Sequence, residues 1–302
     1  MTHPAFPEPA ENSMRGIMLM LAAFVTFSCM DTISKLLGSM GYPAVFITWG
    51  RLLSQIVLLT PLVVMQGGIS VLQTRHPGSQ FLRGLGMLAA GVFFISGLHF
   101  LPLATMTAIN FVGPFVVTIL SIIFLKEKVG KHRWIAIVVG FAGALVIIRP
   151  GGASFHWASL FAVAGACGWS VAVITTRLVQ RDDSTLTTLM LTAIVGFIGC
   201  SLMLPFFWKT PTLTAVGLLV AMSIGGTTGQ FLMIRALRYA GASVLAPFAY
   251  SQIIWSTALG YIIWREFPDE WTWVGAAVII ACGLYVWYRE RVMSAPGYRR
   301  AS

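Results

Sequence analysis

Apolar residues fill the chain in long, nearly uninterrupted runs that short polar connectors separate. About 20 consecutive apolar residues allow a helix to cross the hydrocarbon core of a membrane. Lipid offers the backbone no hydrogen-bond partners, so such runs form helices, and these runs lack the alternation of a β-barrel strand. The pattern predicts an all-α polytopic membrane protein with ten transmembrane helices, at residues 16–37, 44–64, 82–98, 104–124, 133–149, 157–178, 186–207, 214–235, 243–263 and 271–288.

Composition supports lipid as the solvent of this chain. Of its 302 residues, 57% are hydrophobic and only 10% are charged, whereas soluble domains carry about 25% charged residues. The net charge of +10 might suggest a nucleic-acid partner. The basic residues are dispersed in short connectors rather than gathered on one face or in an arm, so we expect no nucleic-acid binding.

The cysteines and the N-terminus carry little further chemistry. Cys29, Cys167, Cys200 and Cys282 lie inside apolar runs without a CxxC pair, so we expect packing roles and predict no disulfide, metal or cofactor. The first apolar run is long and lacks a clear cleavage site, which indicates an uncleaved span. The tail 1–14 is expected to be disordered.

The distribution of Lys and Arg predicts the orientation of the chain in the membrane. If the N-terminus is cytoplasmic, only Lys35, Arg149, Lys209 and Arg265 lie outside, and Arg51 lies in the membrane. The positive-inside rule favours this arrangement, and it places both termini in the cytoplasm. The inside set is Arg15, Arg75, Arg83, Lys126, Lys128, Lys131, Arg133, Arg177, Arg181, Arg235, Arg238, Arg289, Arg291, Arg299 and Arg300.

Two related stretches reveal an internal repeat. "FLKEKVGKHRW" (124–134) and "IWREFPDEWTW" (263–273) share their acidic and aromatic positions, but the first is basic and the second acidic. The first joins spans four and five, and the second joins spans nine and ten. A repeat of five helices, an odd number, places the second copy upside down, so opposite charges suit opposite sides. We therefore predict two inverted five-helix repeats, 1–150 and 151–302, with a cytoplasmic tail after the second. This architecture is typical of secondary transporters.

The residues at this repeat resemble the drug/metabolite transporter superfamily, in its EamA-type ten-helix branch. The resemblance covers roughly 15–288 and rests on Pro114, on Glu127, and on Gly140 with Gly143; the second copy offers Glu266, Gly275 and Gly283. Ile253 stands at the second-half counterpart of Pro114, with Pro247 six positions earlier, and Lys126 precedes Glu127 where the family often has a small residue. The overall similarity is closest to bacterial amino-acid exporters, of the aromatic amino-acid type.

Three charged residues fall within the apolar spans, where charge is costly and marks either function or pairing. Asp31 and Arg51 are predicted at similar depths, in the outer part of the membrane. Lys35 lies one turn beyond Asp31, within reach of an (i, i+4) pair. One interpretation is a structural ion pair, with Lys35 extending to the headgroups. The other is a proton or substrate-charge site.

Polar and aromatic residues near mid-membrane define the predicted substrate site. Gly113, Pro114 and Pro247 are candidate hinges, because proline removes a backbone donor and can kink a helix. Carbonyls freed at such kinks, and nearby amides, suit a small zwitterion; ordinary kinks in packed helices are the alternative. The predicted substrate-binding residues are Asn110, Trp169, Gln230, Tyr250, Ser251 and Gln252.

These features predict a transporter of the bacterial inner membrane rather than an enzyme. Its partners would be membrane lipid and a small-molecule substrate, with neutral or aromatic amino acids exported by alternating access. A multidrug or cation exporter is the alternative within the carrier class. An intramembrane lipid-modifying enzyme is the alternative outside it, and the sequence offers no nucleophile or base with an orienting partner. Substrate, coupling ion and oligomeric state are left open by the sequence.

Overall fold

A computed structural model describes residues 10–126, 130–150, 155–179, 182–239 and 245–293. Within these ranges the chain consists of helices joined by turns and irregular connectors, without strands. Glu127 and most of the predicted disordered tail lie outside the described residues, as does the far C-terminal tail.

Each of the ten predicted spans corresponds to a helical segment. Eight segments are long and apolar enough to cross a membrane, and Trp134–Ile148 is a shorter apolar one. The unbroken helices are α1 (Ala10–Ser39), α2 (Ala44–Met65), α3 (Pro77–Leu98), α6 (Lys131–Ile148), α7 (Ser159–Val179), α8 (Thr185–Phe207), α9 (Leu213–Tyr239) and α12 (Glu270–Met293). A short 3₁₀ helix, η1 (Gly68–Leu72), lies between α2 and α3.

Two spans, the fourth of each half, are interrupted. The first consists of α4 (Leu103–Asn110) and α5 (Gly113–Leu125), and the second of the 3₁₀ helix η2 (Ala246–Tyr250) and α11 (Ser251–Trp264). Between α4 and α5, the backbone tightens into i→i−3 hydrogen bonds, from Phe111 N to Ala108 O and from Val112 N to Ile109 O. Pro114 then offers no N–H to the carbonyl of Asn110, which would be its partner in a regular helix. Proline thus accompanies the interruption in both halves.

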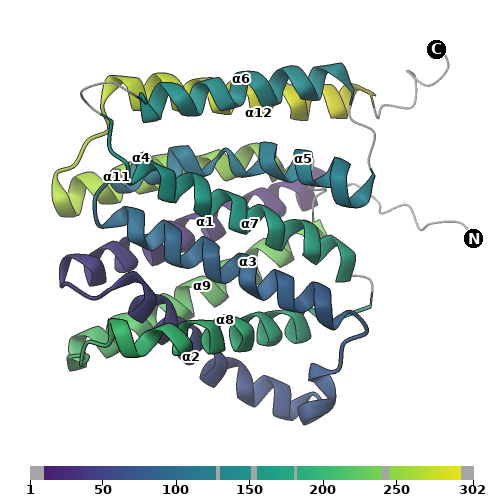
Figure 1. The fold of residues 1–302 in the computed structure, drawn as a ribbon. Coiled ribbons are helices and arrows are strands. Elements are labelled where there is room, and N and C mark those ends of the chain that lie inside the picture. The colour runs from purple at the N-terminus through teal and green to yellow at the C-terminus, as the bar shows by residue number, and fades with distance from the viewer. Residues whose placement is uncertain (1–9, 127–129, 151–154, 180–181, 240–244, 294–302) are drawn as a thin grey trace, which may run out of the picture.

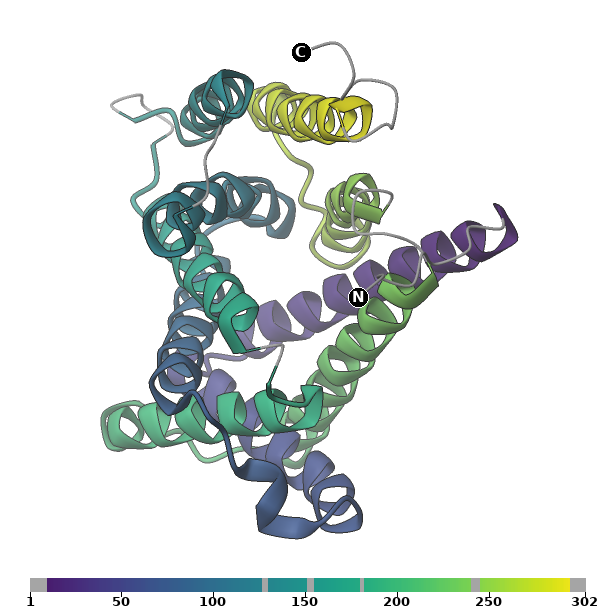
Figure 2. The same ribbon diagram turned by 90° about the vertical axis from the view of Figure 1, so that its right-hand side faces the viewer.

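The packing of the helices follows the inverted repeat. Five spans separate equivalent positions, so each half enters the membrane from the opposite side. Second, fourth and fifth helices pack on their own counterparts, as α2 on α8, α4 on α11 and α6 on α12. The first and third helices of the two halves pack crosswise, α3 on α7 and α1 on α9. Figures 1 and 2 show α6 and α12 lying side by side as a separate layer at one edge of the bundle.

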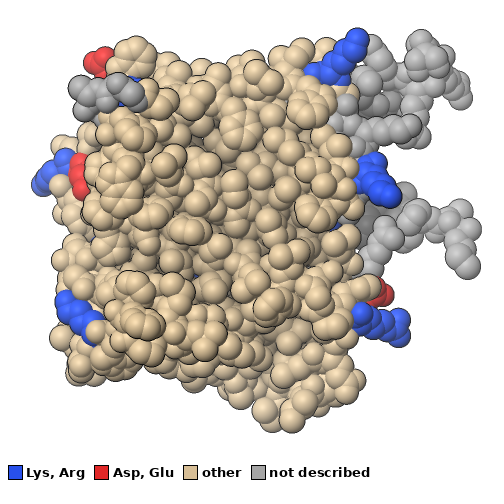
Figure 3. Space-filling model, in the orientation of Figure 1, with Lys and Arg blue, Asp and Glu red and all other residues tan. Residues whose placement is uncertain are grey.

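The surface divides into an apolar belt and two charged ends. Figure 3 shows Lys, Arg, Asp and Glu gathered at the two ends of the helices, with an uncharged lateral surface between them. Large apolar side chains on this lateral surface are exposed, among them Val57, Val138 and Leu202. This distribution is the one expected for helices surrounded by lipid. We call the end at which α1 begins and α12 ends the terminal end, and the opposite end the distal end.

Glycine permits the closest approach between the halves. A Cβ atom added to Gly86 on α3 would lie 2.7 Å from the carbonyl oxygen of Gly168 on α7, and the reverse distance is also 2.7 Å. In the α6–α12 layer, a Cβ on Gly275 would lie 2.5 Å from the carbonyl oxygen of Gly143. Backbone atoms cannot rotate away as a side chain does, so these contacts require glycine, as is common between transmembrane helices.

Candidate functional site

Asp31 is a buried acid on α1, with 6% of its surface exposed. Its carboxylate accepts a hydrogen bond from the Gln252 amide on α11, with 3.2 Å between Nε2 and Oδ2. It forms no ion pair with any of the residues that the structure describes. An acid in a membrane span that is held only by a neutral amide is costly to keep ionised and is a candidate for function.

Lys35 has a different partner from the predicted one. Its ammonium forms an ion pair with Glu266, which follows α11. It also donates to the carbonyl oxygen of Leu101 at 3.4 Å and lies 4.9 Å from the centre of the Trp264 ring. The long side chain extends toward the distal end, away from Asp31, and Lys35 thereby links α1 to the second half rather than neutralising the acid one turn earlier.

A group of hydroxyls connects three helices near Asp31. The Ser28 and Ser256 hydroxyls lie 3.5 Å apart, and Thr107 donates to Ser256 at 3.1 Å. These side chains come from α1, α11 and α4, so both halves contribute. Satisfied hydroxyls of this kind stabilise helix contacts in membranes. Together with the Asp31–Gln252 bond they make the α1–α4–α11 contact a polar seam within an apolar bundle.

Arg51 on α2 carries the complementary charge. Its guanidinium makes no hydrogen bond to the described part of the chain, whereas its backbone carbonyl accepts one from Ser223 on α9 at 2.8 Å. Arg51 and Asp31 attract one another electrostatically, but they do not form a contact ion pair. The two charges thus face the interior separately, without direct mutual neutralisation.

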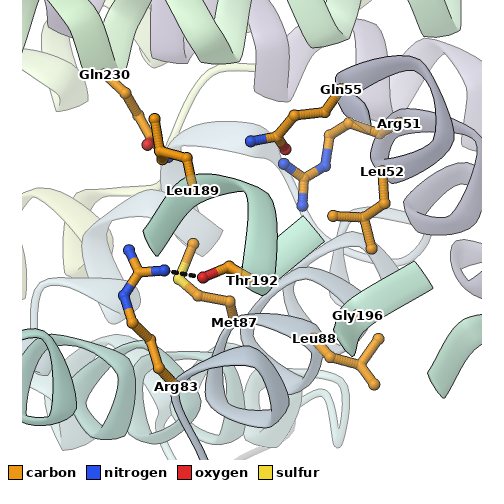
Figure 4. Close-up of a pocket in the computed structure, with 10 residues that line it drawn as sticks. All are labelled: Arg51, Leu52, Gln55, Arg83, Met87, Leu88, Leu189, Thr192, Gly196 and Gln230. Atoms are coloured by element: carbon orange, nitrogen blue, oxygen red, sulfur yellow. Dashed lines mark hydrogen bonds between the residues drawn. The ribbon is translucent and has the colours of Figure 1, made fainter. Parts of the chain in front are cut away.

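A pocket between α2, α3, α8 and α9 is lined by five polar side chains. Figure 4 shows the guanidinium groups of Arg51 and Arg83 directed into the same space, with the amides of Gln55 and Gln230 beside them. Thr192 completes the polar part of the lining. The rest of the lining is apolar or small, and comprises Leu52, Met87, Leu88, Leu189 and Gly196.

The position of Arg83 in the structure differs from the predicted one. The prediction places it on the cytoplasmic side, at the very start of span 82–98, but α3 begins at Pro77 and Arg83 lies more than a turn inside the helix, 9% exposed. Its guanidinium donates to Thr176 Oγ1 at 2.7 Å, to the Thr188 carbonyl at 3.2 Å and to the Thr192 hydroxyl. All three acceptors are neutral, so Arg83 is held in place with its charge intact.

The structure distributes the predicted substrate-binding residues over separate places. Gln230 lines the pocket of Figure 4, and Gln252 holds Asp31. Ser251 donates to the Phe248 carbonyl at 2.7 Å, closing the turn between η2 and α11. Asn110 is half-buried at the end of α4, next to the interruption.

The two predicted aromatic residues pack against the interrupted spans. The Tyr250 ring lies 5.0 Å from the Phe111 ring, which joins η2 to the α4–α5 interruption. The indole of Trp169 covers Gly113, since a Cβ on that glycine would lie 3.0 Å from Trp169 Cε3. Of the predicted hinges, Gly113 is buried, Pro114 is exposed and Pro247 lies in η2. Sequence reasoning missed Gln55 and Thr192, which differ from many other polar residues only in their location.

Comparison with known proteins now identifies the family. The profile of the EamA-like transporter family matches residues 14–149 and again residues 156–288. The chain belongs to this family. The double match agrees with the two-repeat architecture, and it confirms the resemblance that the sequence motifs indicate.

Relatives along the whole chain are small-molecule transporters. The S-adenosylmethionine uptake transporter of Rickettsia bellii is 31% identical over 91% of this chain and 94% of its own length. The pseudopaline exporter of Pseudomonas aeruginosa is 30% identical over 88% of this chain and 94% of its own length. The riboflavin transporter of Vibrio cholerae is 27% identical over 88% of this chain and 91% of its own length. None of these three is an aromatic amino-acid exporter, so they do not support the predicted resemblance to exporters of that type.

A solved crystal structure shares the fold. It superposes with a TM-score of 0.63 over 95% of this chain and 100% of its own, at 17% sequence identity. At the level of the family, this chain is therefore a multi-pass membrane transporter of small molecules and not an enzyme.

Proposed function

We propose that this protein exports small amphipathic metabolites with an amino-acid head group, neutral and aromatic amino acids foremost, by alternating access. The transporter lies in the bacterial inner membrane with both termini in the cytoplasm. Its two halves move relative to one another, and the substrate binds where they meet.

The observation that carries this proposal is the separation of Asp31 from Arg51. Asp31 is buried with only the neutral Gln252 as a partner, and Arg51 acts on it from a distance without contact. An α-amino acid carries an ammonium and a carboxylate on the same carbon atom. Bound between Asp31 and Arg51, it would neutralise both residues at once, which relieves the cost of keeping isolated charges in the membrane.

The named substrates of two relatives agree with this chemistry. S-adenosylmethionine contains an α-amino-acid group and an aromatic base, and a transporter of this compound is 31% identical to the chain. Riboflavin contains a large aromatic ring system, and a transporter of it is 27% identical. A polar head beside an aromatic or apolar body is the property that neutral aromatic amino acids share with the first of these compounds.

The alternative of a multidrug or cation exporter is less well supported by the charges. A cationic substrate favours an unpaired acid inside the membrane, which Asp31 provides. Arg51 and Arg83 would repel such a substrate, however, and neither is neutralised by an ion pair within the described residues. A zwitterion suits this set of charges better.

Counterflow in proteoliposomes tests the proposal. Purified full-length protein is loaded with unlabelled L-phenylalanine, L-leucine, S-adenosylmethionine, riboflavin or a lipophilic drug cation, and uptake of each labelled compound is measured. We expect counterflow with L-phenylalanine or L-leucine that Asp31→Asn abolishes and Glu270→Gln, an exposed acid at the distal end, preserves. Counterflow with the drug cation alone would contradict the proposal.

A further inference from the structure

Two arginine side chains share one pocket inside the bundle. Arg51 comes from α2 and Arg83 from α3, and both line the space shown in Figure 4. No Asp or Glu belongs to its lining. Like charges converging in a membrane interior repel one another and are poorly solvated, so this arrangement calls for an anionic group between them.

We propose that Arg51 and Arg83 form a subsite for the carboxylate of the transported compound. The inference rests on the proposed function and assigns the recognition of one part of the substrate to named side chains. The planar guanidinium matches a carboxylate with two parallel N–H···O bonds, which gives direction as well as strength.

The two arginines have different roles in this subsite. Arg83 is fixed by hydrogen bonds to Thr176, Thr188 and Thr192, which orient its guanidinium without neutralising it. The guanidinium of Arg51 makes no hydrogen bond to the described residues, so its donors are available to a ligand. Arg83 thus supplies a preorganised positive charge, and Arg51 supplies free donors.

The rest of the lining suits an amphipathic acid. The amides of Gln55 and Gln230 can donate to the carboxylate or accept from a neighbouring ammonium. Leu52, Leu88 and Leu189 form the apolar part of the lining. The free volume of the pocket is about 20 Å³, little more than one water molecule occupies, so in this conformation the pocket admits the carboxylate and the apolar body of the substrate would lie outside it.

The position of the pocket couples binding to the two halves. The helices α2 and α3 belong to the first half, and α8 and α9 to the second. A carboxylate held by Arg51 and Arg83 beside Thr192 and Gln230 contacts both halves at once. When the halves move, the pocket changes shape, which is the property that alternating access requires of a substrate site.

Matched compounds on the full-length protein test the subsite. The first pair is L-phenylalanine and phenylethylamine, and the second is S-adenosylmethionine and its decarboxylated form; 3-phenylpropanoate keeps the carboxylate and lacks the ammonium. Affinity is measured from the shift in melting temperature of purified protein, and transport by counterflow. For each pair that binds, we expect the carboxylate to strengthen binding on the order of 10- to 100-fold.

Variants assign this discrimination to the two arginines. Arg51→Gln and Arg83→Gln should reduce the preference for the carboxylate compound to within about threefold. Arg51→Lys should also lose most of this preference, because a lysine keeps the charge but lacks the bidentate fork. Arg75→Gln, which removes an exposed arginine from the connector before α3, should leave it unchanged. The preference of the wild-type protein for the carboxylate compound needs no variant. The proposal can therefore still be contradicted if a variant fails to fold.

The outcomes separate this inference from the proposed function. Equal binding of a compound and its decarboxylated partner, or a preference that survives in both glutamine variants, overturns the subsite. Stabilisation by 3-phenylpropanoate that Arg51→Gln abolishes, without amino-acid counterflow, supports the subsite and refutes the proposed function. Repeating the binding measurement with phosphatidylglycerol in place of phosphatidylcholine tests whether a lipid anion occupies the pocket instead of the substrate. Loss of 3-phenylpropanoate binding in phosphatidylglycerol would assign the pocket to lipid.

Discussion

Lys35 on α1 forms an ion pair with Glu266, which lies immediately beyond α11, and thereby ties the two halves together at the distal end. The Lys35 side chain is 9% exposed and that of Glu266 33% exposed. Arg149 and Asp269 form a second pair between the halves at the same end. Partial burial acts to raise the pKa of Asp269, but hydrogen bonds from Thr272 and Arg149 lower it overall, so this acid stays ionised and paired.

The Lys35–Glu266 pair should stabilise the contact between the two halves at the distal end. Lys35→Met and Glu266→Gln are each expected to lower the melting temperature, and the double variant should lose less than the two single losses combined. A coupling free energy of about 0.5–3 kcal/mol is expected for residues in direct contact. Glu270→Gln, which removes a nearby exposed acid, is the control and should have little effect. Additive losses would mean that the pair contributes nothing as a pair.

The orientation of the chain is open to a direct labelling test. In a variant without the four native cysteines, single cysteines are placed at Glu270 and at Lys131, both exposed and at opposite ends. The positive-inside rule predicts that an impermeant maleimide labels intact cells only at position 270. Labelling at position 131 alone would invert the topology and place both termini outside.

The spans were predictable because hydropathy alone determines them. Each run long enough to cross a membrane is a helical segment in the structure, and interrupted spans were expected at Pro114 and Pro247. Arg83 was misplaced because a charged residue near a span border looks like a connector residue in sequence. Only the Thr176, Thr188 and Thr192 acceptors, on two other helices, explain why it is buried.

The polar contacts of the site were not predictable from spacing. Lys35 has Asp31 within (i, i+4) reach, but its partner Glu266 lies in the other half of the chain. Gln252 is predicted from the sequence as a substrate ligand, and the structure shows it as the hydrogen-bond partner of Asp31. Such contacts depend on the packing between helices, which periodicity along one helix does not specify.

Asp31 and Arg51 should be energetically coupled although they do not touch. Asp31→Asn and Arg51→Gln are each expected to reduce transport, because either change removes the long-range attraction that stabilises the opposite charge in the membrane interior. In the double variant, the loss of folded protein should be smaller than the two single losses combined. The yield of monodisperse protein and its melting temperature measure this effect, and strict additivity would show that the residues act independently.

At the closest point between α3 and α7, replacement of glycine by a residue with a side chain should be destabilising. Gly86→Ala and Gly168→Ala each place a Cβ within 2.7 Å of a backbone oxygen, so we expect a loss of about 1–3 kcal/mol from overpacking. Gly217→Ala on α9, where nothing lies within 4 Å, is the matched control and should be neutral or slightly stabilising. Melting temperatures in detergent compare the three, and equal values would show that the helices separate easily here.

The aromatic residues at the interrupted spans should affect transport more than stability. The Tyr250 ring packs at a tilt against the Phe111 ring, and Trp169 is 39% exposed where it covers Gly113. Rings in these positions can hold an aromatic or branched side chain and attract an ammonium, worth about 0.5–2 kcal/mol for each contact. Trp169→Ala and Tyr250→Ala are therefore expected to weaken transport of aromatic and branched amino acids severalfold while expression is maintained.

Lipid-facing positions provide the control for this last comparison. Val138 on α6 is 65% exposed and Val274 on α12 is 50% exposed, in the layer that Figure 1 shows at one edge of the bundle. Val138→Ala and Val274→Ala should leave counterflow unchanged. If they reduce it as much as Trp169→Ala and Tyr250→Ala do, the two aromatic residues serve helix packing alone. Selective loss with large amino acids, together with retained transport of small ones, would instead locate the side-chain part of the substrate beside the interruption at Gly113.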